Sequence, residues 1–217
     1  MKANLFAGVV IFAVVTTVVL AAQGPPADQV AQERARAELD VPKLAVLLDL
    51  KPGMTVADVG AGFGAMTVVF GNWLRPDGRI FATDIAERQL ATIRDYVKRE
   101  NLSNVTVLQG ATGSTNLPAE CCDAVFMRDV YHHLTLPADF NRSLAAALKP
   151  GGRLAVIDFL PEPGSKLFPG VNPNRGGHGI SPELVVSEVS EAGLRHERTV
   201  DRWPDLEGGL FLVLFRK

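Results

Sequence analysis

Apolar residues follow two alternating patterns from about residue 55 to the end of the chain. Short apolar runs rich in β-branched residues, such as residues 55–59, indicate buried strands. Longer segments such as residues 87–100 place Leu90, Ile93 and Val97 at helical spacing. This alternation predicts a mostly parallel α/β sheet with helices on both faces. Strands are predicted at residues 55–59, 79–83, 105–108, 124–127, 153–159, 195–200 and 210–216, and helices at residues 28–39, 42–50, 65–74, 87–100, 139–148 and 181–193.

The last two predicted strands are connected differently from the others. Residues 201–209 join them through a loop that has Pro204 and two glycines but no helical pattern. A parallel crossover would need a longer connection, so these two strands are expected to be antiparallel. The sequence therefore predicts a seven-stranded, mostly parallel sheet with one antiparallel strand at its end.

The first 22 residues have a pattern of their own. Lys2 precedes an uncharged apolar run over residues 5–22, and small residues close to Ala22 offer a cleavage site, as in a secretory signal peptide. The run is also about as long as the shortest membrane-spanning helix, so an uncleaved anchor is the alternative. A buried core helix is a weaker third interpretation, because the run has no polar face. With Lys2 inside, the first two interpretations place the rest of the chain outside the cytoplasm, exported to the periplasm or exterior, or membrane-anchored.

The length of 217 residues supports one sizeable core rather than two domains. We expect a signal peptide or membrane anchor at 1–22, a linker and helices at 23–50, and the functional domain at 51–217. The net charge of −2, without a basic stripe, argues against a nucleic-acid partner. Cys121 and Cys122 are adjacent, and neighbours on a strand point to opposite faces, so no disulfide is expected between them. The oligomeric state is left open.

A glycine-rich segment follows the first predicted strand and begins a predicted helix. Residues 58–64 read Asp-Val-Gly-Ala-Gly-Phe-Gly. Glycines here allow a sharp turn and a close approach of the backbone to a ligand. Asp84 ends the next strand, where a carboxylate is placed to accept hydrogen bonds from ribose hydroxyls. Both features lie at carboxyl ends of strands, where open α/β sheets bind ligands.

Two kinds of cofactor are compatible with this segment. Gly60, Gly62 and Ala65 satisfy the spacing of a nicotinamide-dinucleotide loop. Asp58, however, would face a pyrophosphate with like charge, whereas it would pair well with the ammonium group of S-adenosylmethionine (SAM). A parallel sheet that ends in one antiparallel strand also resembles the arrangement of SAM-dependent methyltransferases.

Three segments carry a resemblance to a known family. Residues 56–64, residues 148–154 (Leu-Lys-Pro-Gly-Gly-Arg-Leu) and residues 129–134 (Asp-Val-Tyr-His-His-Leu) resemble motifs of class I SAM-dependent methyltransferases, the last in a small-molecule branch. The resemblance extends from about residue 41 to the end of the chain. It implies a Rossmann-like fold and methyl transfer from SAM to a small-molecule acceptor by direct displacement. The cofactor contacts that we expect are Asp58, Gly60, Ala61, Gly62 and Gly64 for the methionine part, Asp84 for the ribose, Ile85 for the adenine, and Gly110, Ala111 and Arg128 beside them.

One position departs from that family's pattern. The family often has Gly-Asp-Ala after the third strand, and its acid contacts the adenine amino group. This chain has Gly110, Ala111 and Thr112 instead. Backbone groups or Thr112 must then recognise the adenine.

The segment after the fourth predicted strand supplies the candidate catalytic residues His132, Tyr131 and Asp129. A histidine titrates near neutrality and could deprotonate an acceptor, and His132 is favoured over His133. The alternative is that one imidazole packs inward and anchors the loop. Tyr131 is expected as a wall of the pocket rather than a base, and Asp129 as a ligand of the acceptor or of the cofactor ammonium.

The long Gly- and Pro-rich segment 159–179 is a candidate lid that would bring His178 into the site. A mobile surface loop is an equal alternative. Asp158 is a further candidate to face the pocket. No metal is expected, although His132, His133 and His178 form a weak alternative as a metal site.

Two other functions remain as alternatives to methyl transfer. The first is a non-catalytic module that binds SAM or a nucleotide. The second is an NAD(P)-dependent oxidoreductase, based on the glycine spacing alone.

Overall fold

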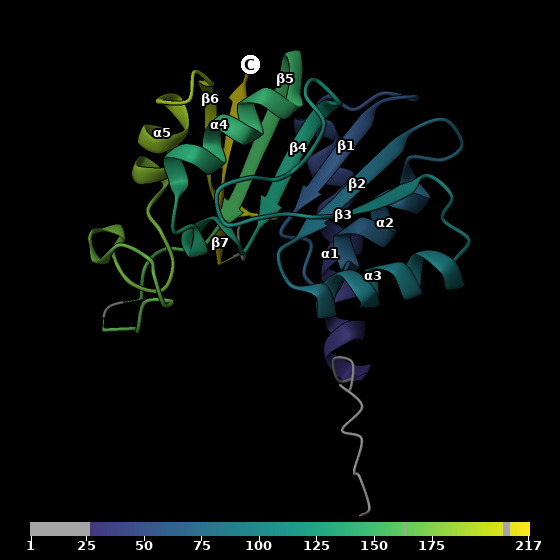
Figure 1. Ribbon diagram of the computed structural model, residues 1–217, viewed down its shortest axis with the longest axis horizontal. Helices are drawn as coiled ribbons and strands as arrows, with labels where there is room; N and C mark the ends of the chain where they lie inside the picture. The colour runs from purple at the N-terminus through teal and green to yellow at the C-terminus, as the bar shows by residue number, and fades with distance from the viewer. Residues whose placement is uncertain (1–26, 163, 206–208) are drawn as a thin grey trace, which may run out of the picture.

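The computed structural model describes residues 27–162, 164–205 and 209–217, and the predicted signal or anchor segment lies outside them. Within these residues, seven strands form one sheet in the order β3-β2-β1-β4-β5-β7-β6 (Figure 1). The strands are β1 (Thr55–Val59), β2 (Arg79–Asp84), β3 (Val105–Gln109), β4 (Cys122–Arg128), β5 (Leu148–Asp158), β6 (Arg195–Trp203) and β7 (Leu210–Arg216). The helices are α1 (Ala27–Leu47), α2 (Ala65–Trp73), α3 (Glu87–Arg99), α4 (Pro137–Ala147) and α5 (Pro182–Ser190), with 3₁₀ turns η1 (Tyr131–His133) and η2 (Pro173–Arg175).

Alternate residues of the central strands point into two apolar layers. In β4, Val125 and Met127 pack in the layer that includes α4 and α5, whereas Phe126 between them packs against α1 and α2. The strands read as near-continuous apolar runs because both faces of the sheet are covered. The predicted α/β fold with helices on both faces is therefore confirmed.

The antiparallel strand is confirmed, but it does not lie at the edge. β7 pairs antiparallel with both β5 and β6, and lies between them. The short loop before β7 fixes only that β6 and β7 run in opposite directions. Which of the two strands adjoins β5 depends on burial, and the apolar β7 takes the inner position, whereas the more exposed β6 takes the edge.

The N-terminal helix differs from the prediction of two helices. Residues 27–47 form a single helix with Pro42 inside it. The proline removes one intrahelical hydrogen bond. Ala37, Val41 and Leu44 are nevertheless buried as one continuous face against α2 and the sheet. Burial of that face keeps the helix continuous through the proline.

Two smaller expectations were also wrong. β5 begins at Leu148, earlier than the predicted start at residue 153. Cys121 and Cys122 are paired as a disulfide between adjacent residues. Cys121 lies just before β4, so the strand alternation on which the expectation rested does not apply to it. Among the described residues, no helix has both the length and the apolar character needed to cross a membrane.

Candidate functional site

A cavity of about 590 Å³ lies at the carboxyl ends of the central strands. There β1 has β2 on one side and β4 on the other, so the chain changes direction across the sheet. Such a switch point is where open α/β sheets bind ligands. Most of the predicted cofactor residues line this cavity, namely Asp58, Gly60, Ala61, Gly62, Asp84, Ile85, Gly110, Ala111 and Arg128.

The glycine loop is fixed against the end of β2. The N–H groups of Gly60 and Ala61 both donate to the carbonyl of Thr83, at 2.8 and 2.9 Å. Gly60 has φ +75°, and a Cβ there would lie 2.5 Å from Cγ1 of Val130. Glycine is therefore required at position 60 by both conformation and space. Gly62, in contrast, would direct a Cβ into open space, so its backbone is accessible to a ligand.

Gly64, a predicted cofactor contact, is not among the residues that line the cavity. It precedes α2 with φ +85°, and a Cβ there would lie 2.9 Å from Ile93 of α3. Its glycine is explained by helix packing rather than by the ligand. The cavity lining therefore gives no support to Gly64 as a cofactor contact.

Asp58 is a buried carboxylate in the wall of the cavity. One oxygen accepts a hydrogen bond of 2.6 Å from the hydroxyl of Thr67 on α2. Burial raises the pKa of Asp58 to about 7; Thr67 lowers it and the nearby Asp84 raises it further. A buried carboxylate beside the cavity attracts a cationic ligand group and repels a pyrophosphate. The site therefore disfavours a dinucleotide.

Asp84 holds the loop as well as facing the cavity. Its two oxygens accept hydrogen bonds of 3.0 Å from the N–H groups of Gly62 and Ala86. The side chain remains partly exposed, and each carboxylate oxygen has further acceptor capacity. It can therefore bind two ribose hydroxyls while keeping the glycine loop in place.

The residues expected to contact the adenine line one part of the cavity. Ile85 is 60% exposed and lines the cavity, which gives an apolar surface for a base. Ala111 forms a small bridge with Ser114, with hydrogen bonds in both directions, and both residues line the cavity together with Thr112. Backbone groups and Thr112 thus occupy the place of the missing acid.

Arg128 and Asp129 connect the end of β4 to the N-terminal helix. The Arg128 guanidinium pairs with Asp40 of α1 at 2.8 Å and with Asp129 at 2.6 Å. Asp129 has φ +57°, an uncommon conformation for a residue other than glycine. Its second oxygen, Oδ1, is buried without a hydrogen-bond partner among the described residues. Burial raises the pKa of Asp129 despite the nearby Arg128. Strain and an unpaired oxygen in a cavity wall are typical of a binding site.

Tyr131 is placed in the core rather than in the cavity wall. It is fully buried, its hydroxyl accepts a hydrogen bond of 2.7 Å from Asn141, and the cavity-lining residues of the described chain do not include it. Burial also raises its pKa. The structure thus places Tyr131 outside the cavity lining, because the turn at η1 directs this side chain under α4, and its catalytic role stays a prediction.

His132 also does not line the cavity, whereas His133 does. The His132 ring is buried, and its Nδ1 lies 2.8 Å from Oδ1 of Asp158. Asp158 itself is fully buried and holds His132 instead of facing the cavity. The geometry therefore supports the anchoring alternative for His132 rather than a base. Burial and the neighbouring His132 lower the pKa of His133 to about 4.

Other cavity residues were missed by the sequence analysis. Phe168, from the candidate lid segment, reaches the cavity, as do Leu134, Thr135 and Phe140. The N-terminal helix contributes Gln29, Glu33 and Arg36. No local pattern marks these residues, because they meet the site only after the helices and the segment 159–179 have packed.

Comparisons with known proteins agree with this arrangement. Residues 57–156 match a family model described as a methyltransferase domain. The ubiquinone/menaquinone biosynthesis C-methyltransferase UbiE of Ectopseudomonas mendocina is 31% identical over 123 residues, which cover 56% of this chain and 48% of that protein. The erythromycin 3''-O-methyltransferase of Saccharopolyspora erythraea is 35% identical over 179 residues, which cover 74% of this chain and 56% of that protein. The chain thus spans about half the length of the curated relatives it matches.

One solved structure is matched over a larger share of its own length than these two relatives are. The crystal structure of a SAM-dependent methyltransferase from Aquifex aeolicus superposes with a TM-score of 0.68 at 29% identity. The match covers 87% of this chain and 97% of that chain. The similarity therefore extends over most of this chain and nearly all of that one.

Proposed function

The chain belongs to the class I SAM-dependent methyltransferases, and on that basis we propose that it transfers a methyl group from SAM to a small-molecule acceptor by direct displacement. The observation that carries this proposal is the pair of carboxylates, Asp58 and Asp84, at the ends of adjacent strands. The open backbone at Gly62 lies between them along the loop.

The cavity residues fit SAM in charge and in size. Asp58 supplies a buried acid for the ammonium group, Asp84 has acceptor capacity for the ribose, and Ile85 presents an apolar surface to the adenine. A volume of about 590 Å³ is in the range of small-molecule sites and leaves space for an acceptor beside the cofactor.

The reaction that we propose is a direct displacement, in which the protein aligns the acceptor with the methyl group. SAM supplies a methyl group on a sulfonium sulfur, so an attacking acceptor atom forms a bond to the methyl carbon as the carbon–sulfur bond breaks and its electrons return to sulfur. Alignment of the two reacting atoms is the main contribution that the protein can make to such a displacement. Asp129, held by Arg128, offers its unpaired oxygen to the acceptor or to the cofactor ammonium.

The acceptor side of the cavity favours a molecule with an apolar part. Leu134, Phe140 and Phe168 line the cavity beside the polar His133 and Thr135. The names of two relatives indicate small-molecule acceptors, one in ubiquinone/menaquinone biosynthesis and the other erythromycin. We therefore propose an acceptor that combines an apolar body with a hydroxyl, thiol, amine or activated carbon.

Turnover on a panel of acceptors tests this proposal. The full chain is incubated with methyl-labelled SAM and with phenols, quinols, aliphatic alcohols, amines and thiols that carry apolar groups. We expect label in at least one acceptor and an equal amount of S-adenosylhomocysteine, and loss of both in Asp84→Ala. Binding of SAM without turnover on the whole panel would favour the non-catalytic alternative.

We also propose that residues 1–22 export the domain or anchor it in a membrane. The support is the basic start at Lys2 followed by the uncharged apolar run over residues 5–22. Fusion of the full chain to a periplasmic reporter enzyme tests the location. N-terminal sequencing of the mature protein separates cleavage near Ala22 from an uncleaved anchor.

A further inference from the structure

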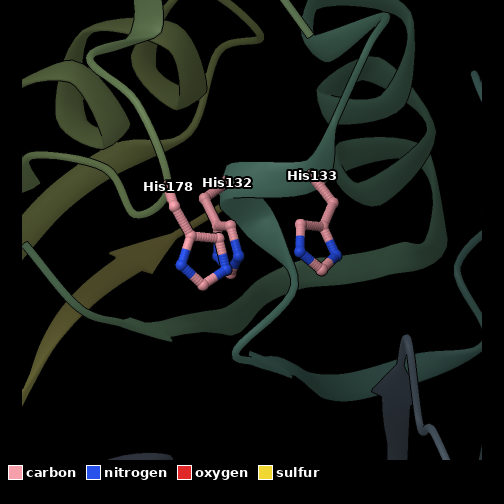
Figure 2. A group of neighbouring side chains, drawn as sticks. All are labelled: His132, His133 and His178. Carbon is pink, nitrogen blue, oxygen red and sulfur yellow. The ribbon is translucent and has the colours of Figure 1, made fainter. Parts of the chain in front are cut away.

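Three of the four histidines in the sequence lie together beside the cavity. His132 and His133 are in η1, and His178 comes from the segment before α5 (Figure 2). One ring nitrogen from each of the three lies within 4.8 Å of the other two. The ring centroid of His132 lies 4.0 Å from that of His133 and 5.0 Å from that of His178.

We propose that His132, His133 and His178 bind one divalent transition-metal ion at the acceptor side of the cavity. Three neutral imidazoles suit Zn²⁺, and three protein ligands with one open position are the usual arrangement of a catalytic zinc site. Zinc–nitrogen bonds of about 2.0–2.1 Å place tetrahedral ligand atoms roughly 3.3 Å apart. The three side chains therefore need to close by only about 1–2 Å to coordinate an ion.

His132 is already oriented as a metal ligand. Asp158 engages its Nδ1, so the free nitrogen is Nε2. That Nε2 is buried, and it has no hydrogen-bond partner among the described residues. A buried polar atom without a partner destabilises the protein, and coordination of an ion would offset that cost. A carboxylate on the far nitrogen of a ligating histidine is a recurring feature of zinc sites.

His178 is held in place by the backbone around it. Its N–H donates to the hydroxyl of Ser165 at 2.9 Å, and its carbonyl accepts from the N–H of Glu162 at 3.0 Å. Gly179, with φ +100°, packs so tightly that a Cβ would lie 2.7 Å from the carbonyl oxygen of Leu160. The segment is therefore fixed on both sides of the histidine, and it brings the imidazole to the other two.

Aromatic side chains pack around the three histidines. Phe159 packs against His132 and His178 at centroid distances of 4.8 and 5.0 Å, and Phe168 packs on His133 at 3.7 Å. These ring contacts therefore hold each of the three imidazoles in the cluster.

The position of His133 links the ion to the cavity. His133 belongs to the cluster and also lines the cavity, together with Phe168. An ion on the three histidines would have its open position available to an acceptor oxygen or sulfur entering from the cavity. This second step rests on the proposed function, since it assigns the open position to the acceptor.

Metal titration of the full chain tests the site directly. The protein is treated with a chelator, dialysed and titrated with Zn²⁺ by calorimetry, and with Co²⁺ by visible absorption. We expect one ion per chain and the intense absorption of tetrahedral cobalt. His178→Ala and His133→Ala should each lower Zn²⁺ affinity by more than the roughly 10- to 100-fold that follows loss of an outer partner.

His196→Ala is the matched control, because His196 is the remaining histidine and is exposed on β6, where it bonds Thr199. It should bind Zn²⁺ like the parent chain. Absence of stoichiometric binding by the parent, or equal affinity in His178→Ala and His196→Ala, would overturn the site. Far-UV circular dichroism of His178→Ala excludes a loss of folding as the cause.

Two further readouts separate this inference from the proposed function. SAM titrations of the same samples report on the cofactor site alone. Metal binding without SAM binding would support the proposed metal site and contradict the proposed methyl transfer. Azide added to the Co²⁺ protein probes the open position. A change of the cobalt spectrum supports a position accessible from the cavity, and an unchanged spectrum contradicts the assignment to the acceptor.

Discussion

Asp158 accepts two hydrogen bonds from His132, one from the ring Nδ1 at 2.8 Å and one from the backbone N–H at 3.1 Å. An ionised carboxylate can only accept, so Nδ1 carries the proton and Nε2 is left with its lone pair. The pair joins the end of β5 to η1. Its effect is to fix both the tautomer and the direction of the imidazole.

Replacement of Asp158 tests this orientation. Asp158→Asn keeps the shape but removes the charge, so we expect Zn²⁺ affinity to fall by roughly 10- to 100-fold in calorimetric titration. Asp139→Asn is the control, because Asp139 is exposed on α4 and pairs with Arg142. Equal Zn²⁺ affinity in both variants would show that the carboxylate does not support a metal ligand.

SAM affinity should increase with pH around neutrality. Burial raises the pKa of Asp58 to about 7, so part of the ligand-free protein carries a protonated acid at that pH. The ionised form pairs with the cofactor ammonium, and affinity therefore rises as pH increases through about 7. The titrations should be carried out below about pH 7.5, because the α-amino group of SAM is expected to lose its charge near pH 7.7–8.0. Asp58→Asn should bind SAM more weakly and without this pH dependence, and a parallel pH profile in the variant would contradict the assignment.

Two glycines with similar backbone conformations should respond differently to alanine. Gly53 and Gly60 have φ of +82° and +75°, but only at Gly60 would a Cβ strike a neighbour, Val130. We expect Gly53→Ala to cost about 1–2 kcal/mol in urea unfolding, from backbone strain alone. Gly60→Ala should cost about 1–3 kcal/mol more because of overpacking. Val130→Ala should recover part of that difference, and no recovery would exclude the clash as its cause.

Tyr131 should matter for stability and not for the cofactor. Tyr131→Phe leaves the buried Nδ2 of Asn141 without its acceptor, so the free energy of unfolding should fall by about 1–3 kcal/mol. SAM affinity should be unchanged within calorimetric error. A selective loss of SAM binding or turnover, with stability retained, would restore the catalytic role that the sequence suggested.

Much of the fold and of the cofactor half of the site could be predicted because the signals are local. The apolar strands at residues 55–59 and 79–83 end in Asp58 at the glycine loop and in Asp84, so strand order alone brings these residues together. The Ser181 cap, which accepts from the N–H of Leu184, is likewise a short-range feature. Parallel pairing converts such local patterns into a site without further information.

The acceptor half could not be predicted because it depends on long-range packing. His178 reaches His132 only through the conformation of the segment that ends at Gly179. The direction of the side chains at Tyr131 and His132 depends on which of them turns under α4, and that is decided by Asn141 and Asp158. No spacing in the sequence distinguishes these outcomes.

Calorimetric titration of the full chain with SAM, S-adenosylhomocysteine and NADPH tests the central claim most directly. The account predicts binding of SAM and of S-adenosylhomocysteine, no binding of NADPH, and a marked loss of both in Asp84→Ala, because Asp84 both holds Gly62 and faces the cavity. Binding of NADPH alone, or SAM affinity unchanged in Asp84→Ala, would contradict it.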